Sequence, residues 1–326
     1  MGDISKLHCF AIFCLTFFPS STPISLDSMT ATQSLSNDQT LVSAGQVFEL
    51  GFFNPGNSQW YLGIWYKKIL GKTVVWVANR DTPLSNSSGT FKIGDHGNIV
   101  VLDQAGNISW SSNETHAANP VVLLLDSGNL VVKEMNENNP EKYLWQSFDY
   151  PTDTLLPGMK LGWDLDPDFD RYLTSWKSSV DPSTGDYLFK LDFRGFPEIF
   201  LRNKQGVEYR SGPWNGLRFS GVPEMAPLNG LGFDFVMEEH EVYYSYSITN
   251  ASLISRLVVN ATNGDLQRFT WIESSGAGSG TYIGMLRKIS VTATKSAVHT
   301  VYATQMRRRC AGVWKALHPK IYRRGI

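Results

Sequence analysis

The chain contains one short pattern twice, first as Asp95-His-Gly-Asn-Ile-Val-Val-Leu102 and again as Asp126-Ser-Gly-Asn-Leu-Val-Val-Lys133. In each copy a polar segment with Gly and Asn precedes an apolar run. Gly and Asn tolerate the backbone angles of tight turns, whereas β-branched residues favour strands. The repeat therefore predicts a turn that leads into a strand, used at least twice.

A second strand ending on tryptophan follows each copy, at Trp110 and at Trp145, and Thr73-Val-Val-Trp76 is the corresponding strand of an earlier unit. These units predict three related sheets. A pseudo-threefold arrangement lets one large aromatic side chain from each unit pack near a common axis. We expect Trp76, Trp110 and Trp145 to form core rather than to bind a ligand.

Short runs of β-branched and aromatic residues continue from Gln46 to Trp271, interrupted by Gly, Asn, Asp, Pro and Ser. This punctuation is typical of strands and tight turns, and no long segment keeps helical spacing with a capped start. Beyond Asp153, further strands are predicted at 187–193, 198–201, 242–248 and 255–259. The sequence predicts an all-β chain with a second β domain.

Composition argues against nucleic acid as a partner and against disulfide bonds in the main body of the chain. The formal net charge is -1 over 326 residues, so there is no electrostatic reason to expect nucleic acid. The three cysteines are Cys9, Cys14 and Cys310, which leaves residues 26–309 without thiols. Apolar burial must hold this body together, and most of the 10 Trp, 18 Phe and 13 Tyr of the chain lie within it and supply large side chains.

The N-terminus predicts secretion. A short polar start with Lys6 precedes the apolar run Leu7–Phe18, then Pro19 and small residues, which is the order of a secretory signal peptide. No other stretch approaches the roughly 20 apolar residues of a membrane helix, so no membrane span is expected. Sequons for N-glycosylation stand at Asn86, Asn107, Asn113, Asn250 and Asn260, which also favours a secreted, extracellular product.

Several longer motifs resemble a known family. Phe48-Glu-Leu-Gly-Phe-Phe53, Tyr61-Leu-Gly-Ile-Trp-Tyr66 and Val74-Val-Trp-Val-Ala-Asn-Arg-Asp81 are similar to the bulb-type lectin domain of plant S-locus glycoproteins and G-type lectin S-domain receptor-like serine/threonine kinases. The segments 144–158 and Arg210-Ser-Gly-Pro-Trp-Asn-Gly216 are similar to later parts of the same family.

The resemblance implies tandem β-prism lectin-like domains on the cell exterior. The resemblance also implies that an EGF-like segment, a PAN domain, a membrane helix and a kinase follow in full-length receptors, and we expect this chain to lack them. We expect a truncated extracellular part: a signal peptide at 1–25, a bulb-type lectin domain at 26–152, an S-locus glycoprotein domain at 153–273 and a tail at 274–326.

The mannose motif of the lectin relatives, Gln-x-Asp-x-Asn-x-Val-x-Tyr, survives only in fragments. Asn98 and Val100 remain in one copy, and Asn129 and Val131 in the other. The Gln, Asp and Tyr positions hold Gly94, His96 and Leu102 in the first copy and Leu125, Ser127 and Lys133 in the second. A sugar site needs several converging polar groups, so these four residues are degenerate sugar-site positions, better interpreted as turn and strand core.

No enzyme motif is present in the body: no P-loop, Gly-x-Ser-x-Gly, His-Glu-x-x-His or kinase signature. We expect no catalytic residue and no cofactor. The histidines His96, His116, His240 and His299 are scattered without metal-ligand spacing, so isolated surface histidines and no metal site are predicted.

The character of the sequence changes after Ser274, where a Gly/Ser-rich linker precedes a basic end containing Arg307-Arg-Arg309. Reading the codons of this part in a shifted frame can restore a segment similar to the family's EGF-like region. We therefore predict that residues 274–326 are an irregular tail read out of frame. A true basic tail for nucleic acid or membranes is the rival interpretation.

The resemblance implies a recognition module that binds a secreted peptide or protein, or another S-domain receptor, in pollen recognition or defence signalling. Residues 195–245 are the predicted partner surface, because loops on a rigid scaffold carry recognition. The alternatives are a mannose-binding defence lectin, which the degraded motif disfavours, and a fragment of a membrane receptor kinase.

Overall fold

A computed structural model describes residues 27–272, apart from 37, 70, 226–229, 251–252 and 263, together with residues 289–291. The expected signal peptide and nearly all of the expected tail lie outside this described part. Its regular elements are strands and three short 3₁₀ turns, η1 (Pro140–Lys142), η2 (Ser147–Asp149) and η3 (Pro223–Met225). None of the described residues forms a helix long and apolar enough to cross a membrane.

The strands up to residue 146, here called the N-terminal half, form three antiparallel sheets of four strands each. The first sheet has the order β3 (Thr40–Val42), β4 (Phe48–Phe53), β5 (Tyr61–Tyr66) and β6 (Val74–Val77). The second has the order β2 (Ser34–Ser36), β7 (Thr90–Ile93), β8 (Ile99–Leu102) and β9 (Ile108–Ser111). The third has the order β1 (Ser28–Thr30), β10 (Pro120–Leu124), β11 (Leu130–Glu134) and β12 (Trp145–Gln146).

The sequence repeat corresponds to this threefold plan. The apolar runs of the two copies are β8 and β11, and the three tryptophans lie on the last strand of each sheet. Trp76, Trp110 and Trp145 contact one another edge to face, with every pair of ring centroids 6.1 Å apart. The prediction that one aromatic from each unit meets near a common axis is confirmed.

Glycine makes the two repeated turns possible. Gly97 and Gly128 have φ of +72° and +86°, a left-handed conformation that residues with a Cβ adopt only under strain. The turn closes in the same way in both copies, because Gly94 N–H donates to the Asn98 carbonyl at 2.7 Å and Leu125 N–H donates to the Asn129 carbonyl at 2.9 Å. The predicted turn-and-strand unit is therefore confirmed.

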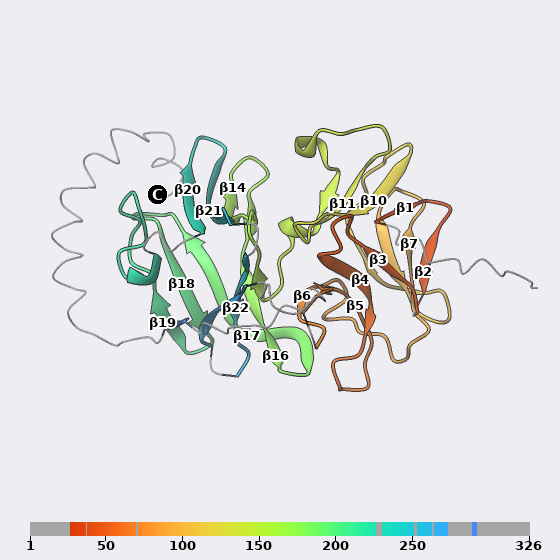
Figure 1. Ribbon diagram of the computed structural model, residues 1–326, viewed down its shortest axis with the longest axis horizontal. Coiled ribbons are helices and arrows are strands. Elements are labelled where there is room, and N and C mark those ends of the chain that lie inside the picture. The colour runs from red at the N-terminus through yellow and green to blue at the C-terminus, as the bar shows by residue number, and fades with distance from the viewer. Residues whose placement is uncertain are drawn as a thin grey trace, which may run out of the picture.

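The strands from residue 154 onward, here called the C-terminal half, form three further four-stranded sheets, and no sheet shares strands with the N-terminal half (Figure 1). One has the order β13 (Thr154–Leu155), β22 (Leu253–Val259), β23 (Leu266–Ile272) and β24 (Ile289–Val291). Another has the order β15 (Phe169–Arg171), β14 (Leu161–Asp164), β21 (Glu241–Ile248) and β20 (Leu231–Met237). The last has the order β16 (Leu173–Ser178), β17 (Asp181–Asp192), β18 (Glu198–Asn203) and β19 (Gly206–Arg210).

The all-β tandem architecture expected from the sequence is thus present. One detail differs, because β24 belongs to the stretch 274–326, which was expected to be irregular. It pairs antiparallel with β23, Leu266 lying opposite Val291. A strand edge offers free N–H and C=O groups, so even three residues can pair there.

A buried arginine joins the two halves. Arg80 follows β6, is 8 % exposed, and donates from Nε to the Pro182 carbonyl and from Nη2 to the Ser175 carbonyl, both at 2.8 Å. Its Nη1 donates to Thr174 Oγ1 at 2.9 Å. A guanidinium presents several donors in one plane, so it can satisfy several carbonyls of two adjacent strands at once.

Further polar contacts extend this joint. Arg256 of β22 donates from Nη1 to the Val74 carbonyl at 2.7 Å, and Asp81 accepts from the Thr184 N–H at 2.7 Å. Asp153 lies buried in the electrostatic field of Arg256 and Arg80, and burial raises its pKa while the two cations lower it. Burial has the opposite effect on Arg80, because it lowers the pKa of the guanidinium. The nearby Asp153 carboxylate raises that pKa and so opposes the shift. These charges compensate one another across the joint.

Candidate functional site

The four predicted sugar-site positions occupy matching places in two different sheets. Val100 and Val131 are buried on β8 and β11, and Asn98 and Asn129 end the turns that precede these strands. The structure does not bring the two pairs together into one site. It gives the two asparagines different surroundings.

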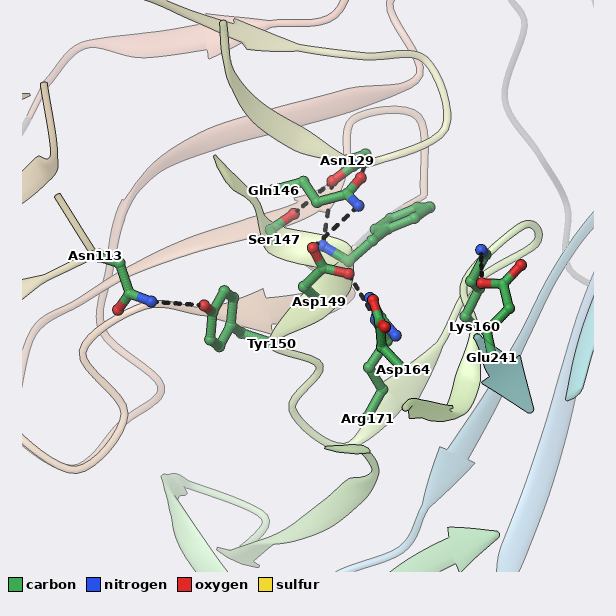
Figure 2. A network of polar contacts seen from close by, with 11 residues as sticks. Asn113, Asn129, Gln146, Ser147, Asp149, Tyr150, Lys160, Asp164, Arg171 and Glu241 are labelled. Carbon is green, nitrogen blue, oxygen red and sulfur yellow. Dashed lines mark hydrogen bonds and ion pairs between the residues drawn. The ribbon is translucent and has the colours of Figure 1, made fainter. Parts of the chain in front are cut away.

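The Asn129 side chain is enclosed by the chain itself, at 5 % exposure. Its Nδ2 donates to Gln146 Oε1 at 2.9 Å, and its Oδ1 accepts from Ser147 Oγ and from Phe148 N–H, both at 3.2 Å (Figure 2). The amide thus holds the turn before β11 onto β12 and η2. Both ends of this amide have partners within the chain.

Asn98 lies closer to the surface. Its Nδ2 donates to Ser111 Oγ at 2.7 Å, on the neighbouring strand β9. The segment ahead of it, with exposed His96, faces the loop that follows β9. The two copies of the motif therefore differ, one being enclosed by protein and the other open to solvent.

The contacts of Asn129 continue into a longer chain of polar contacts, the junction network of Asn129, Gln146, Asp149, Arg171 and Asp164 (Figure 2). Gln146 Nε2 donates to Asp149 Oδ2 at 3.1 Å, and Arg171 Nε donates to Asp149 Oδ1 at 2.6 Å. Arg171 Nη2 also lies 3.9 Å from Asp164 Oδ2. Arg171 belongs to β15, so a position of the predicted degenerate sugar motif is linked to the C-terminal half.

Sequence reasoning did not find this network. The segment 144–158 was noted only for its resemblance to the family, and Arg171 carried no signal of its own. Its guanidinium also lies 5.1 Å from the centre of the Phe169 ring. A partner 22 residues away from Asp149 cannot be recognised from local spacing.

We predict that replacing Asn129 by alanine lowers the free energy of unfolding by about 1–3 kcal/mol, because buried Ser147 Oγ and Phe148 N–H lose their acceptor. The matched change Asn98→Ala, at the same place in the other copy, removes one hydrogen bond near the surface. It should lower the free energy of unfolding by no more than about 0.5 kcal/mol. Urea unfolding of both variants measures the difference. Equal costs would contradict the structural role of Asn129.

Four of the five predicted glycosylation residues, Asn86, Asn107, Asn113 and Asn250, are exposed, whereas Asn260 is half-buried. Asn113 Nδ2 donates to the Tyr150 hydroxyl at 3.0 Å (Figure 2). A glycan needs an accessible amide nitrogen, and all five positions remain predicted sites.

The expectation that the histidines are isolated is wrong for one pair. The turn before β8 and the loop after β9 bring His96 and His116 together, with ring centroids 6.3 Å apart, and Glu114 joins them. The antiparallel pairing of β8 with β9 places these residues side by side, although 20 positions separate the two histidines in the sequence. His240 lies elsewhere, and its Nδ1 is 2.5 Å from Asp166 Oδ2.

The C-terminal half carries a hydrogen-bonded turn with an exposed apolar residue, here called the tip turn (Trp214–Phe219). Trp214 stacks on Phe235 at 5.5 Å and packs edge to face on Phe219 at 5.3 Å. Asn215 Oδ1 accepts from the N–H groups of Leu217 and Arg218, both at 3.0 Å. Leu217, within this turn, is 81 % exposed.

Beneath the tip turn lies a small apolar cavity of about 60 Å³, lined among others by Phe219, Phe189 and Tyr244. Burial raises the pKa of Tyr244 to about 12, so this hydroxyl stays neutral at any physiological pH. The cavity walls are mainly apolar, so they support the turn by packing.

Two family descriptions match the chain. Residues 73–177 match the D-mannose binding lectin family, and residues 209–281 match the S-locus glycoprotein domain. The first match crosses the predicted boundary at residue 152, and the domain limits proposed from the sequence remain predictions.

Relatives are similar over most of the chain. The receptor-like serine/threonine-protein kinase SD1-8 of Arabidopsis thaliana is 55% identical over 277 residues, which are 82% of this chain and 32% of the relative. The S-locus-specific glycoprotein BS29-2 of Brassica oleracea var. alboglabra is 49% identical over 270 residues, 81% of this chain and 61% of the relative. The chain thus spans less than two thirds of either relative.

Among solved structures, the mannose-specific agglutinin of snowdrop bulbs is 19% identical, with a TM-score of 0.27 over 35% of this chain and 94% of the agglutinin. The lectin and S-locus glycoprotein matches occur in this order along one chain, as do the two halves of the fold. The chain therefore carries a D-mannose binding lectin region and an S-locus glycoprotein region, and it is about half identical to S-locus glycoproteins and receptor-like kinases over about four fifths of its length.

Proposed function

We propose that this chain is an extracellular recognition module that binds a secreted peptide or protein partner and does not bind mannose. The observation that carries the proposal is the enclosure of Asn129. Its amide makes hydrogen bonds to Gln146, Ser147 and Phe148. A sugar hydroxyl would have to displace these bonds, which costs free energy at a buried position.

The tip turn supplies the kind of surface that a protein partner uses. An apolar side chain held on a rigid support binds with little loss of conformational entropy. The Leu217 backbone is held by the bond from its N–H to Asn215 Oδ1, and the turn around it is held by the packing of Trp214 on Phe235. Val207, on the edge strand β19, is also exposed, at 43 %. Both residues fall within 195–245, the predicted partner surface.

The partner class comes from the family. The chain is similar both to receptor kinases and to S-locus glycoproteins, so an S-domain receptor is a second candidate partner beside a secreted peptide. We assign no catalytic step to this chain. If it is part of a longer receptor, the same surface would serve as the ligand-binding face of that receptor.

The proposal is tested by selecting a phage-displayed random peptide library on the secreted full chain. We expect enriched peptides whose binding falls at least tenfold, or about 1.4 kcal/mol, when Leu217 is replaced by aspartate. Ile108→Asp is the matched control, because Ile108 is also apolar and exposed, at 63 %, but lies on β9 of the N-terminal half. Biolayer interferometry measures both variants.

If the enriched peptides bind Leu217→Asp as well as the unchanged chain, the tip turn is not the surface. If Ile108→Asp abolishes binding instead, the recognition surface belongs to the N-terminal half. Circular dichroism of both variants establishes that neither change unfolds the protein.

A further inference from the structure

We propose that His96, Glu114 and His116, here called the histidine cluster, form a binding site for a divalent transition metal ion of the zinc type. Their ligand atoms, one from each residue, all lie within 4.8 Å of one another. His116 Nε2 is 3.5 Å from Glu114 Oε2. Two imidazoles and one carboxylate are a ligand set that zinc accepts, with further positions left for water or an outside ligand.

The backbone holds the two segments of the cluster together. The N–H groups of Thr115 and His116 both donate to the His96 carbonyl, at 3.2 and 2.9 Å. Thr115 Oγ1 donates to the Gly97 carbonyl at 2.9 Å. A side chain at Gly97 would not fit, because its Cβ would lie 2.4 Å from Thr115 Oγ1. The two backbone segments that carry the ligands are therefore held together by bonds that do not depend on the metal.

His116 adds a second sign of a constrained loop. Its φ is +53°, in the left-handed region that residues with a Cβ rarely adopt. Such conformations persist where the surroundings hold them, and here the bond from His116 N–H to the His96 carbonyl does so. The imidazole therefore projects from a fixed backbone rather than from a free loop.

The side chains can close onto an ion without repacking. Ligand atoms bound to tetrahedral zinc lie about 3.3 Å apart, so the cluster needs to contract by about 1.5 Å at its widest pair. The His116 and Glu114 side chains are 74% and 54% exposed, so their rotamers can change without disturbing the core. The ion pair that the described residues give Glu114 is with His116, itself a proposed ligand, so the carboxylate can balance part of the metal charge once both side chains bind the ion.

The cluster stands where the sugar motif has been lost. His96 occupies the position of the motif's Asp, two residues before Asn98, on the copy that is open to solvent. The same turn that would present polar groups to a sugar thus presents an imidazole. The inference is independent of the peptide surface proposed above, since the tip turn belongs to the C-terminal half.

The test is isothermal titration calorimetry, in which zinc chloride is added to the purified full chain. We expect one zinc ion per chain at this site. His96→Ala and His116→Ala should each raise the dissociation constant at least tenfold, since mutating even a residue that only hydrogen-bonds to a metal ligand lowers metal affinity about 10–100-fold. Cobalt(II) bound in place of zinc should give visible absorption bands that both variants lose. Magnesium, which prefers oxygen ligands, should not compete.

His240→Ala is the matched control, because His240 also lies beside a carboxylate, that of Asp166, but away from the cluster. It should leave zinc binding unchanged. The proposal is overturned if the double variant His96→Ala, His116→Ala binds zinc as the unchanged chain does, or if His240→Ala removes the binding. Circular dichroism checks that the variants remain folded.

Discussion

Replacing Trp76 by alanine is expected to lower the free energy of unfolding by about 3–5 kcal/mol, the range for deleting a large buried aromatic side chain. Trp76 is 4% exposed and contacts both other tryptophans of the axis. Its Nε1 also donates to the Tyr150 carbonyl at 2.8 Å, at the end of the N-terminal half. Alanine would leave a cavity among three sheets and an unsatisfied carbonyl, which urea unfolding measures.

A pair of milder changes separates packing from hydrogen bonding. Trp76→Phe keeps much of the ring but loses the bond to Tyr150, so it should still cost about 1–3 kcal/mol. In the described part of the chain, Trp176 has a buried Nε1 without a hydrogen-bond partner. Trp176→Phe removes that orphan donor and should be nearly neutral. A cost below about 1.5 kcal/mol for Trp76→Ala would mean that the axis does not hold the sheets together.

The second large effect is expected at the joint between the halves. Arg80→Ala should destabilise the chain by about 3–5 kcal/mol, the usual result of removing one member of a buried charged group. The carbonyls of Pro182 and Ser175 would lose their donor, and buried Asp153 would keep only Arg256 as a nearby cation. Thermal unfolding followed by calorimetry would measure the loss.

Two further variants make the result specific. Arg80→Lys keeps the charge but not the planar set of donors, so it should restore only part of the stability. Arg194→Ala removes an exposed arginine paired with Asp192 and should cost no more than about 1 kcal/mol. An Arg80→Ala protein as stable as Arg194→Ala would show that the halves do not depend on this joint.

Local patterns predicted the parts of the fold that repeat. The Gly-Asn turns, the strands after them and the recurring tryptophans are all features of a few consecutive residues, so the three related sheets of the N-terminal half could be anticipated. The similar plan of the C-terminal half was anticipated only from the resemblance to the family, because its strands carry no comparable repeat.

Contacts between distant residues could not be predicted. Arg80 and Pro182 are 102 positions apart, and nothing near Arg80 in the sequence identifies its acceptors. The same holds for the histidine cluster, which exists only because β8 and β9 pair and bring a turn beside a loop. At the sugar-motif positions, sequence identified the residues, but the enclosure of Asn129 depends on Gln146 and Ser147 from the next strand and turn.

The most direct test of the proposed recognition role is chromatography of the purified, folded chain on mannose-agarose. Asn129 is enclosed by hydrogen bonds and the motif around Asn98 has lost its Gln, Asp and Tyr, so we predict that the protein passes through unretained. Retention that free mannose releases, and that Asn98→Ala abolishes, would contradict the account and show that the lectin site still works.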